Sequence, residues 1–218
     1  DLKKVFYTEE VETHALAGIH MTIDRGEYVA ISGPSGCGKS TLLSILGLLD
    51  SPPGGEYRRS GQPGQSLNVA DRARIRNREI GFIFQAFNLI GDLTVYENVE
   101  LPLIYGRAER QSRAERVWET LDAVGLRERA HHRPNELSGG QRQRLCIARA
   151  LVVQPEIYVF DDSFSALDLA TDARLRAALR PQTADAAVLI VAQRVSTITD
   201  ADQILVLDDG RIIGRGTH

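Results

Sequence analysis

Hydrophobic residues along the chain form short continuous runs that alternate with longer stretches of helical periodicity. Runs such as Val29–Ile31 and Val188–Val191 contain no polar residue, which is typical of parallel strands buried on both faces. Strands are therefore expected at 27–32, 81–85, 157–161, 188–192 and 204–207, and helices at 42–49, 109–124, 138–153 and 169–180. This alternation predicts an α/β fold around a parallel sheet.

Two regions depart from this alternation. Near the amino-terminal end, apolar positions within 2–6 and within 15–23 mark two strands, so we expect a small antiparallel β subdomain there. After residue 86 the chain changes character, because Val117, Leu121 and Val124 recur at helical spacing with charged residues opposite them. This region is expected to be a helical insertion in the α/β chain.

The composition is that of an ordinary globular protein. The chain has 218 residues, of which 43% are apolar and 25% charged, enough to bury a sizeable core. We expect a single domain over 1–218, with the core and β subdomain in 1–85 and 142–218 and a helical subdomain in 86–141. A net charge of −3 argues weakly against a nucleic-acid binder. Cys37 and Cys146 suggest no disulfide framework, which fits the cytosol.

The most informative stretch is Gly33–Thr41, which reads Gly-Pro-Ser-Gly-Cys-Gly-Lys-Ser-Thr. It fits the phosphate-loop pattern and lies between an expected strand and an expected helix, as that pattern requires. Lys39 would neutralise the β- and γ-phosphates, and the Ser40 hydroxyl would hold Mg²⁺. The phosphate-binding positions are then Gly33, Ser35, Gly36, Cys37, Gly38, Lys39, Ser40 and Thr41. The sequence therefore predicts a nucleoside triphosphate site.

A second anion site is predicted much later in the chain. Leu137–Gln141 reads Leu-Ser-Gly-Gly-Gln and opens an expected helix. Ser138 and the two glycines would present free N–H groups at the positive end of that helix. The apolar run 157–160 ends in the carboxylate of Asp161, as a central parallel strand with a functional carboxyl end would.

The order of these motifs resembles the nucleotide-binding domain of ABC transporters over nearly the whole chain. The elements that carry the resemblance are Gly33–Thr41, Gln85, Leu137–Gln141, Tyr158–Asp161, Ser165–Asp168 and Gln193. The resemblance implies a P-loop NTPase core, with ATP and Mg²⁺ as ligands. It implies head-to-tail pairing with a second ABC ATPase domain, and a transmembrane transporter subunit as a further partner. The location implied is cytoplasmic, peripheral at the inner membrane when that transporter is bound.

The resemblance also assigns residues to roles. Phe6 resembles the aromatic that stacks on adenine, with Tyr7 as the near alternative. Ser40, Gln85 and Asp161 resemble the Mg²⁺ shell, and Gln85 also positions the attacking water. The residues that resemble those reaching the γ-phosphate held by a partner are Ser138, Gly139, Gly140 and Gln141, and Asp168 lies in the loop that crosses the dimer interface.

Two residues depart from the family pattern. Asp162 stands where the family usually has a glutamate that orients or activates water, and Gln193 stands where it usually has histidine. One methylene less withdraws the carboxylate by roughly 1.3–1.5 Å, and the expected loss of rate is on the order of 10²–10³-fold, given what a positioned base contributes. Gln193 can accept or donate a hydrogen bond but cannot become cationic. The expectation is slow hydrolysis with Lys39, Gln85, Asp162 and Gln193 at the catalytic site. The alternatives are nearly normal turnover and a hydrolysis-impaired, ATP-gated dimerisation module.

Within the family, the resemblance changes along the chain. Residues 1 to about 140 resemble the ATPases of lipoprotein-release and macrolide-export systems, whereas the part after Leu145 resembles the ATPase domain of fused exporters. This suggests a chimera with a seam near 140–155, which would have no assured transporter partner. ABC proteins that act on DNA or ribosomes usually have coiled-coil insertions or tandem cassettes, so no nucleic-acid partner is expected.

Overall fold

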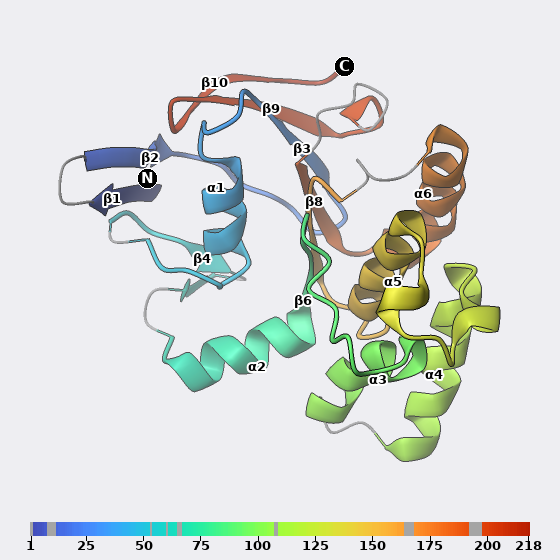
Figure 1. Cartoon of the computed structure of the whole chain (residues 1–218). Coiled ribbons are helices and arrows are strands. Elements are labelled where there is room, and N and C mark those ends of the chain that lie inside the picture. The colour runs from blue at the N-terminus through green and yellow to red at the C-terminus, as the bar shows by residue number, and fades with distance from the viewer. Residues whose placement is uncertain are drawn as a thin grey trace.

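The computed structural model describes residues 2–7, 12–52, 54–59, 61–64, 67–106, 109–163, 168–191 and 198–218. Its centre is a six-stranded sheet in the order β10-β9-β3-β8-β7-β6 (Figure 1). The strands are β3 Tyr28–Ser32, β6 Ile80–Ile83, β7 Ile157–Asp161, β8 Ala187–Val191, β9 Gln203–Asp208 and β10 Arg211–Gly216. Five of them are parallel and β10 pairs antiparallel with β9. The carboxyl ends of β3, β6 and β7 therefore meet at one edge of the sheet.

Both faces of the sheet are covered. Side chains of β8 alternate between the two buried clusters, with Val188 and Ile190 in one and Leu189 and Val191 in the other, as the two-residue period of a strand requires. On one face lie helix α1 (Lys39–Leu46) and the antiparallel pair of β1 (Leu2–Tyr7) and β2 (Glu12–Ile19) (Figure 1). On the other face lie α5 (Gly139–Leu151) and α6 (Leu169–Thr183). The predicted α/β core with an antiparallel β element is thus present.

The remaining elements lie around this core. Two short strands, β4 (Arg58–Arg59) and β5 (Gln62–Pro63), precede α2 (Val69–Glu79), and α3 (Val95–Tyr105) and α4 (Arg110–Ala123) pack beside α5. Short 3₁₀ turns follow at Arg127–Arg129 and Pro134–Glu136. The predicted helical subdomain, 86–141, stays a prediction, because its apolar residues share one buried cluster with the sheet. In the described part of the chain, no helix is both long and apolar enough to cross a bilayer.

Several element boundaries differ from the sequence expectation. Helix α1 ends at Leu46 and is capped by Gly47, because Leu48 has a left-handed φ of 55°. Helix α6 continues through Pro181 to Thr183. Neither α3 nor β10 was expected as a separate element. Four arginines, Arg72, Arg74, Arg76 and Arg78, lie close together in the sequence, and this pattern predicts the solvated face of a helix. They lie in α2, whose buried residue is Ile75.

Candidate nucleotide-binding site

The phosphate loop connects the carboxyl end of β3 to the first turn of α1. Three glycines in it have positive φ: Gly33 at 147°, Gly36 at 81° and Gly38 at 101°. A Cβ on Gly38 would lie 2.2 Å from the carbonyl oxygen of Ala15, and one on Gly33 would lie 2.1 Å from that of Leu207. The loop is therefore pressed against β2 and β9, and only glycine satisfies both the conformation and the close approach.

Lys39 lies over the loop that it belongs to. Its Nζ donates to the carbonyl oxygens of Gly33 at 2.9 Å and Pro34 at 2.6 Å. The Sγ of Cys37, a buried residue, lies 3.7 Å from the same Nζ. The cation is thus already held at the concave side of the loop, where a bound phosphate would exchange these carbonyl contacts for phosphate oxygens.

A hydroxyl and a carboxylate meet beside this loop. Ser40 Oγ donates to Asp161 Oδ1 at 3.2 Å, which joins the start of α1 to the end of β7. Burial raises the pKa of Asp161, while the Ser40 hydrogen bond and the positive charge of Lys39 lower it. Both groups offer the hard oxygen atoms that Mg²⁺ prefers, so the donor set fits the predicted metal.

The ends of β6 and β7 bring two further predicted residues to the same edge. Ile83 of β6 pairs with Phe160 of β7, and the Ser163 hydroxyl donates to the carbonyl oxygen of Ile83 at 2.8 Å. Gln85, which is exposed, follows β6, and Asp162 follows β7. Asp162 has φ of 46°, a left-handed conformation that aspartate tolerates better than most residues.

The second anion site lies at the start of α5. Ser138 forms a capping box with Gln141: the backbone N–H of Ser138 donates to Gln141 Oε1 at 2.8 Å, and the N–H of Gln141 donates to Ser138 Oγ at 3.3 Å. A Cβ on Gly139 would meet no atom within 4 Å. The N–H of Ser138, which the sequence predicted to be free, is therefore taken up by the capping box. The space beside Gly139, at the positive end of the helix, is open to an approaching anion.

For the other predicted site residues, the structure gives few contacts or none. Asp168 caps α6, since its Oδ1 accepts from the N–H of Thr171 at 2.9 Å. Phe6 and Tyr7 lie in β1, but their side chains and all of Gln193 lie outside the described residues. The adenine contact and the Gln193 role therefore stay predictions. Ser163 was missed by sequence reasoning, because a serine after a strand carries no signal of its own.

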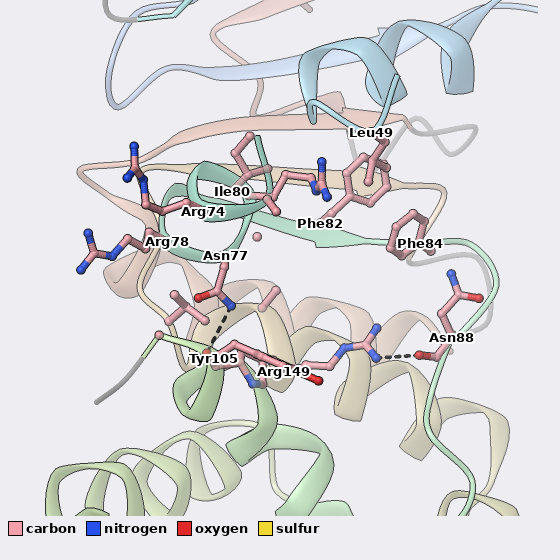
Figure 2. Close-up of a pocket in the computed structure, with 17 residues that line it drawn as sticks. Leu49, Arg74, Asn77, Arg78, Ile80, Phe82, Phe84, Asn88, Tyr105 and Arg149 are labelled. Carbon is pink, nitrogen blue, oxygen red and sulfur yellow. Dashed lines mark hydrogen bonds between the residues drawn. The ribbon is translucent and has the colours of Figure 1, made fainter. Parts of the chain in front are cut away.

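A groove opens away from the phosphate loop, between α2, β6, α3 and α5 (Figure 2). Its volume is about 960 Å³. Phe82 and Phe84 stack on its floor with ring centroids 4.2 Å apart. Tyr105 is 71% exposed at its margin, and Arg74 and Arg78 extend outward from α2 (Figure 2). The groove combines an apolar floor with a basic rim.

Comparisons with known proteins agree with this geometry. The ABC transporter family model matches residues 16–165. The chain is 42% identical over 98% of its length to a macrolide export ATP-binding/permease protein, MacB, of Rhodospirillum rubrum, and it spans 33% of that protein. It is 41% identical over 98% of its length to an uncharacterized ABC transporter ATP-binding protein of Thermotoga maritima, of which it spans 92%.

Solved structures give the same result. The dimeric structure of the ABC transporter cassette MJ0796 has a TM-score of 0.94 and 37% identity, covering 99% of this chain and 96% of that one. A post-hydrolysis dimer of the same cassette, bound to ADP and Pi, has a TM-score of 0.93 and 37% identity, and covers 99% of this chain and 96% of that one.

The chimera hypothesis receives no support from these relatives. Single proteins match between 96% and 100% of the chain. An Atm1-family exporter bound to ATP, covering 98% of this chain and 37% of that one, has a lower TM-score of 0.82 and 30% identity. The chain spans about a third of the macrolide export proteins and over nine-tenths of the separate ATP-binding proteins. From its family match, its relatives and its site, the chain belongs to the ABC transporter family, as an ATP-binding cassette with ATPase chemistry.

Proposed function

We propose that this cassette binds Mg·ATP between its own phosphate loop and the Ser138–Gly140 stretch of a second cassette, and hydrolyses it slowly to ADP and phosphate. The hydrolysis drives a transmembrane transporter at the inner face of the cytoplasmic membrane. The observation that carries this proposal is the contact of Ser40 with Asp161 beside the glycine loop. One chain then carries a phosphate-binding loop with two candidate magnesium ligands beside it.

Catalysis by this arrangement is positional and electrostatic. Lys39 neutralises the β- and γ-phosphates. Ser40 and Asp161 would hold Mg²⁺, which would supply charge neutralisation on the transferred phosphoryl group. Gln85 would add a further oxygen ligand for Mg²⁺ and, with Asp162, orients the attacking water. Gln193 contacts the γ-phosphate, and Phe6 stacks on the adenine.

The need for a second cassette follows from the placement of the two anion sites. The glycine loop precedes α1, whereas Ser138 and Gly139 open α5, a different element on the other face of the sheet. A γ-phosphate held by one chain can therefore be reached by the α5 N-terminus of another. ATP then joins the two cassettes, and its hydrolysis releases them.

The turnover rate depends on Asp162. Its shorter side chain leaves the carboxylate farther from the water than a glutamate would. Its left-handed φ of 46° favours aspartate over glutamate at this position. Both facts support binding of ATP with slow hydrolysis, and the extreme of this behaviour is the hydrolysis-impaired dimerisation module.

The groove described above is the proposed docking surface for the transmembrane partner. Its floor has stacked Phe82 and Phe84, and Leu49 and Tyr105 are 43% and 71% exposed beside it. Arg74 and Arg78 line the same groove. An occupant with matching chemistry is a short cytoplasmic helix of the partner that carries apolar residues flanked by acidic ones.

The test is steady-state ATP hydrolysis with Mg²⁺, together with size-exclusion chromatography with and without ATP. Turnover that rises steeply with protein concentration supports the shared site and a competent Asp162. ATP-dependent dimers with almost no phosphate release support the dimerisation module instead. A chain that neither dimerises nor hydrolyses ATP contradicts the proposal.

A further inference from the structure

The segment that carries Gln85 is fastened two residues away on each side. On the core side, the Ile83 carbonyl oxygen accepts from Ser163 Oγ at 2.8 Å. On the helical side, the Phe87 carbonyl oxygen accepts from Cys146 Sγ at 3.0 Å and from Arg149 Nη2 at 3.4 Å. Gln85 itself is exposed between these fastenings. The backbone on either side of Gln85 is therefore held by the residue that follows the end of β7 by two positions and by helix α5.

The helical-side fastening is a fork from one arginine. Arg149 Nη1 also donates to the carbonyl oxygen of Asn88 at 2.6 Å (Figure 2). Asn88 has a left-handed φ of 47°, so the backbone turns sharply where the guanidinium grips it. Burial lowers the pKa of Arg149, yet a guanidinium stays charged at neutral pH, and a charged donor in a partly buried site makes strong hydrogen bonds.

The Cys146 thiol holds the same backbone segment. Burial raises the pKa of Cys146 to about 11, so its proton is retained at neutral pH and the S–H donates to Phe87. Both Cys146 and Arg149 are on α5, the helix that Ser138 and Gly139 open. The N-terminus of α5 thus forms the second anion site, and the C-terminal half of the same helix contacts the Gln85 segment.

We propose that Arg149, assisted by Cys146, is a positioning residue that holds Gln85 on the attacking water and the Mg²⁺ and ties that position to α5. Engagement of the α5 N-terminus by ATP on a second cassette then sets the Gln85 amide through the Arg149 fork. This inference rests on the proposed function, because the role of Gln85 belongs to that proposal. It adds a residue that lies on none of the nucleotide-binding motifs.

The chain provides a matched control on the same helix. Arg144 also donates to two main-chain carbonyl oxygens, those of Val124 at 3.1 Å and Gly125 at 3.3 Å. Its contacts fasten the end of α4, not the Gln85 segment. Replacement by lysine keeps the charge in both cases. At Arg149 it removes a planar fork of two nitrogens, whereas at Arg144 it removes one nitrogen that is shared between two carbonyl oxygens. Arg149→Lys and Arg144→Lys therefore each disturb the contacts of one α5 arginine with two main-chain carbonyl oxygens, in different places.

The first experiment is a double-mutant cycle on ATP turnover. Arg149→Lys is expected to lower kcat about 10- to 100-fold, as misplacement of a positioning group does, with KM for ATP within about twofold and a higher Mg²⁺ requirement. Arg144→Lys is expected to change kcat by less than about threefold. Because Arg149 acts through Gln85, the variant Gln85→Ala/Arg149→Lys should be no slower than Gln85→Ala alone. Multiplicative losses in that double variant would overturn the inference.

A second readout separates this inference from the proposed function. If the wild-type chain has no turnover, the proposed function fails, and amide hydrogen exchange then tests the fork directly. Arg149→Lys should speed exchange at residues 86–90 and leave 124–126 unchanged, and Arg144→Lys should do the reverse. Exchange that rises across the whole chain, or not at all at 86–90, would show that Arg149 has only a general structural role.

Discussion

The hydroxyl of Ser40 donates a 3.2 Å hydrogen bond to the carboxyl of Asp161, a residue 121 positions later in the chain. Strand β8 lies between the strands that deliver these two residues. The sheet therefore holds the phosphate loop and the acidic strand end at a fixed separation before any nucleotide binds. A hydroxyl and a carboxylate kept together in this way offer two of the oxygen ligands that the proposed magnesium site needs.

Burial of the Asp161 carboxylate should lower the stability of the folded chain at neutral pH. Burial raises the pKa of Asp161 in the folded chain, so the folded chain favours the protonated carboxyl more than the unfolded chain does. Its stabilising contribution is full below the unfolded pKa and is lost as pH rises through the folded pKa. We expect ligand-free Asp161→Asn to melt above wild type at pH 7, with the difference shrinking as pH falls toward about 4. Differential scanning calorimetry across this range measures it.

The same substitution should abolish the magnesium chemistry. Asparagine can still accept the Ser40 hydrogen bond, but it brings no negative charge to the cation. Mg·ATP should stabilise the wild type and not Asp161→Asn, and turnover should fall at least about 100-fold, since metal charge stabilisation contributes several kcal/mol. A variant that melts lower than wild type at pH 7 would contradict the burial argument.

Gly139→Ala should separate the fold from the dimeric site. Gly139 opens α5 and a Cβ there meets no atom within 4 Å, so alanine should stabilise the single chain by about 0.5–1 kcal/mol. The added methyl lies where the γ-phosphate of a second cassette must approach, so turnover should fall about tenfold or more. Gly216→Ala, which also meets nothing within 4 Å, is the control: it should leave turnover unchanged. Unaltered turnover in Gly139→Ala would place the phosphate elsewhere.

Much of this architecture could be predicted from local signals. A buried strand such as 157–161 is a run of apolar residues ended by a carboxylate, and the glycine loop has a fixed spacing that few other structures share. Helix α3 gave no comparable signal, because Pro102 interrupts its pattern of Val95, Val99 and Leu103. In β10, the half-buried Ile212 and exposed Ile213 are followed by Gly214, which weakens the alternation that marks a strand.

The contacts that orient the site could not be predicted in the same way. The Ser163 bond to Ile83 joins residues 80 positions apart, and the Arg149 bond to Asn88 joins residues 61 apart. Their partners are main-chain carbonyl groups, which every residue has, so side-chain identity gives no hint of the pairing. The left-handed φ of Asp162 likewise has no signal in the sequence.

Asp162→Glu should raise the rate of ATP hydrolysis and lower the stability of the folded chain. Glutamate restores the reach that water activation needs, and kcat should rise at least about tenfold. The φ of 46° makes the longer residue less favourable by about 1 kcal/mol, which corresponds to a Tm lower by about 2–4 °C. Asp162→Asn should keep the Tm and lose turnover. If Asp162→Glu failed to raise kcat, the slow step would lie outside this carboxylate.

The groove between α2, β6, α3 and α5 should matter only when the transporter is present. Tyr105 is 71% exposed and lines it, whereas Ile213 is 65% exposed on β10, at the opposite edge of the sheet. Neither residue supports the core, so aspartate at either position should change stability by less than about 0.5 kcal/mol and leave basal ATP turnover intact.

The two variants should differ in the cell. Aspartate at 105 would remove an apolar anchor and repel the acidic residues of the proposed occupant, and an anchor residue at an interface centre contributes about 2 kcal/mol or more. In cells that contain the whole transporter, Tyr105→Asp should therefore bind the membrane fraction roughly 30-fold more weakly than wild type. Ile213→Asp should stay bound. Arg74→Glu combined with Arg78→Glu should weaken binding in the same direction, because the proposed occupant is acidic. Equal release of Tyr105→Asp and Ile213→Asp would mean that the partner binds another face.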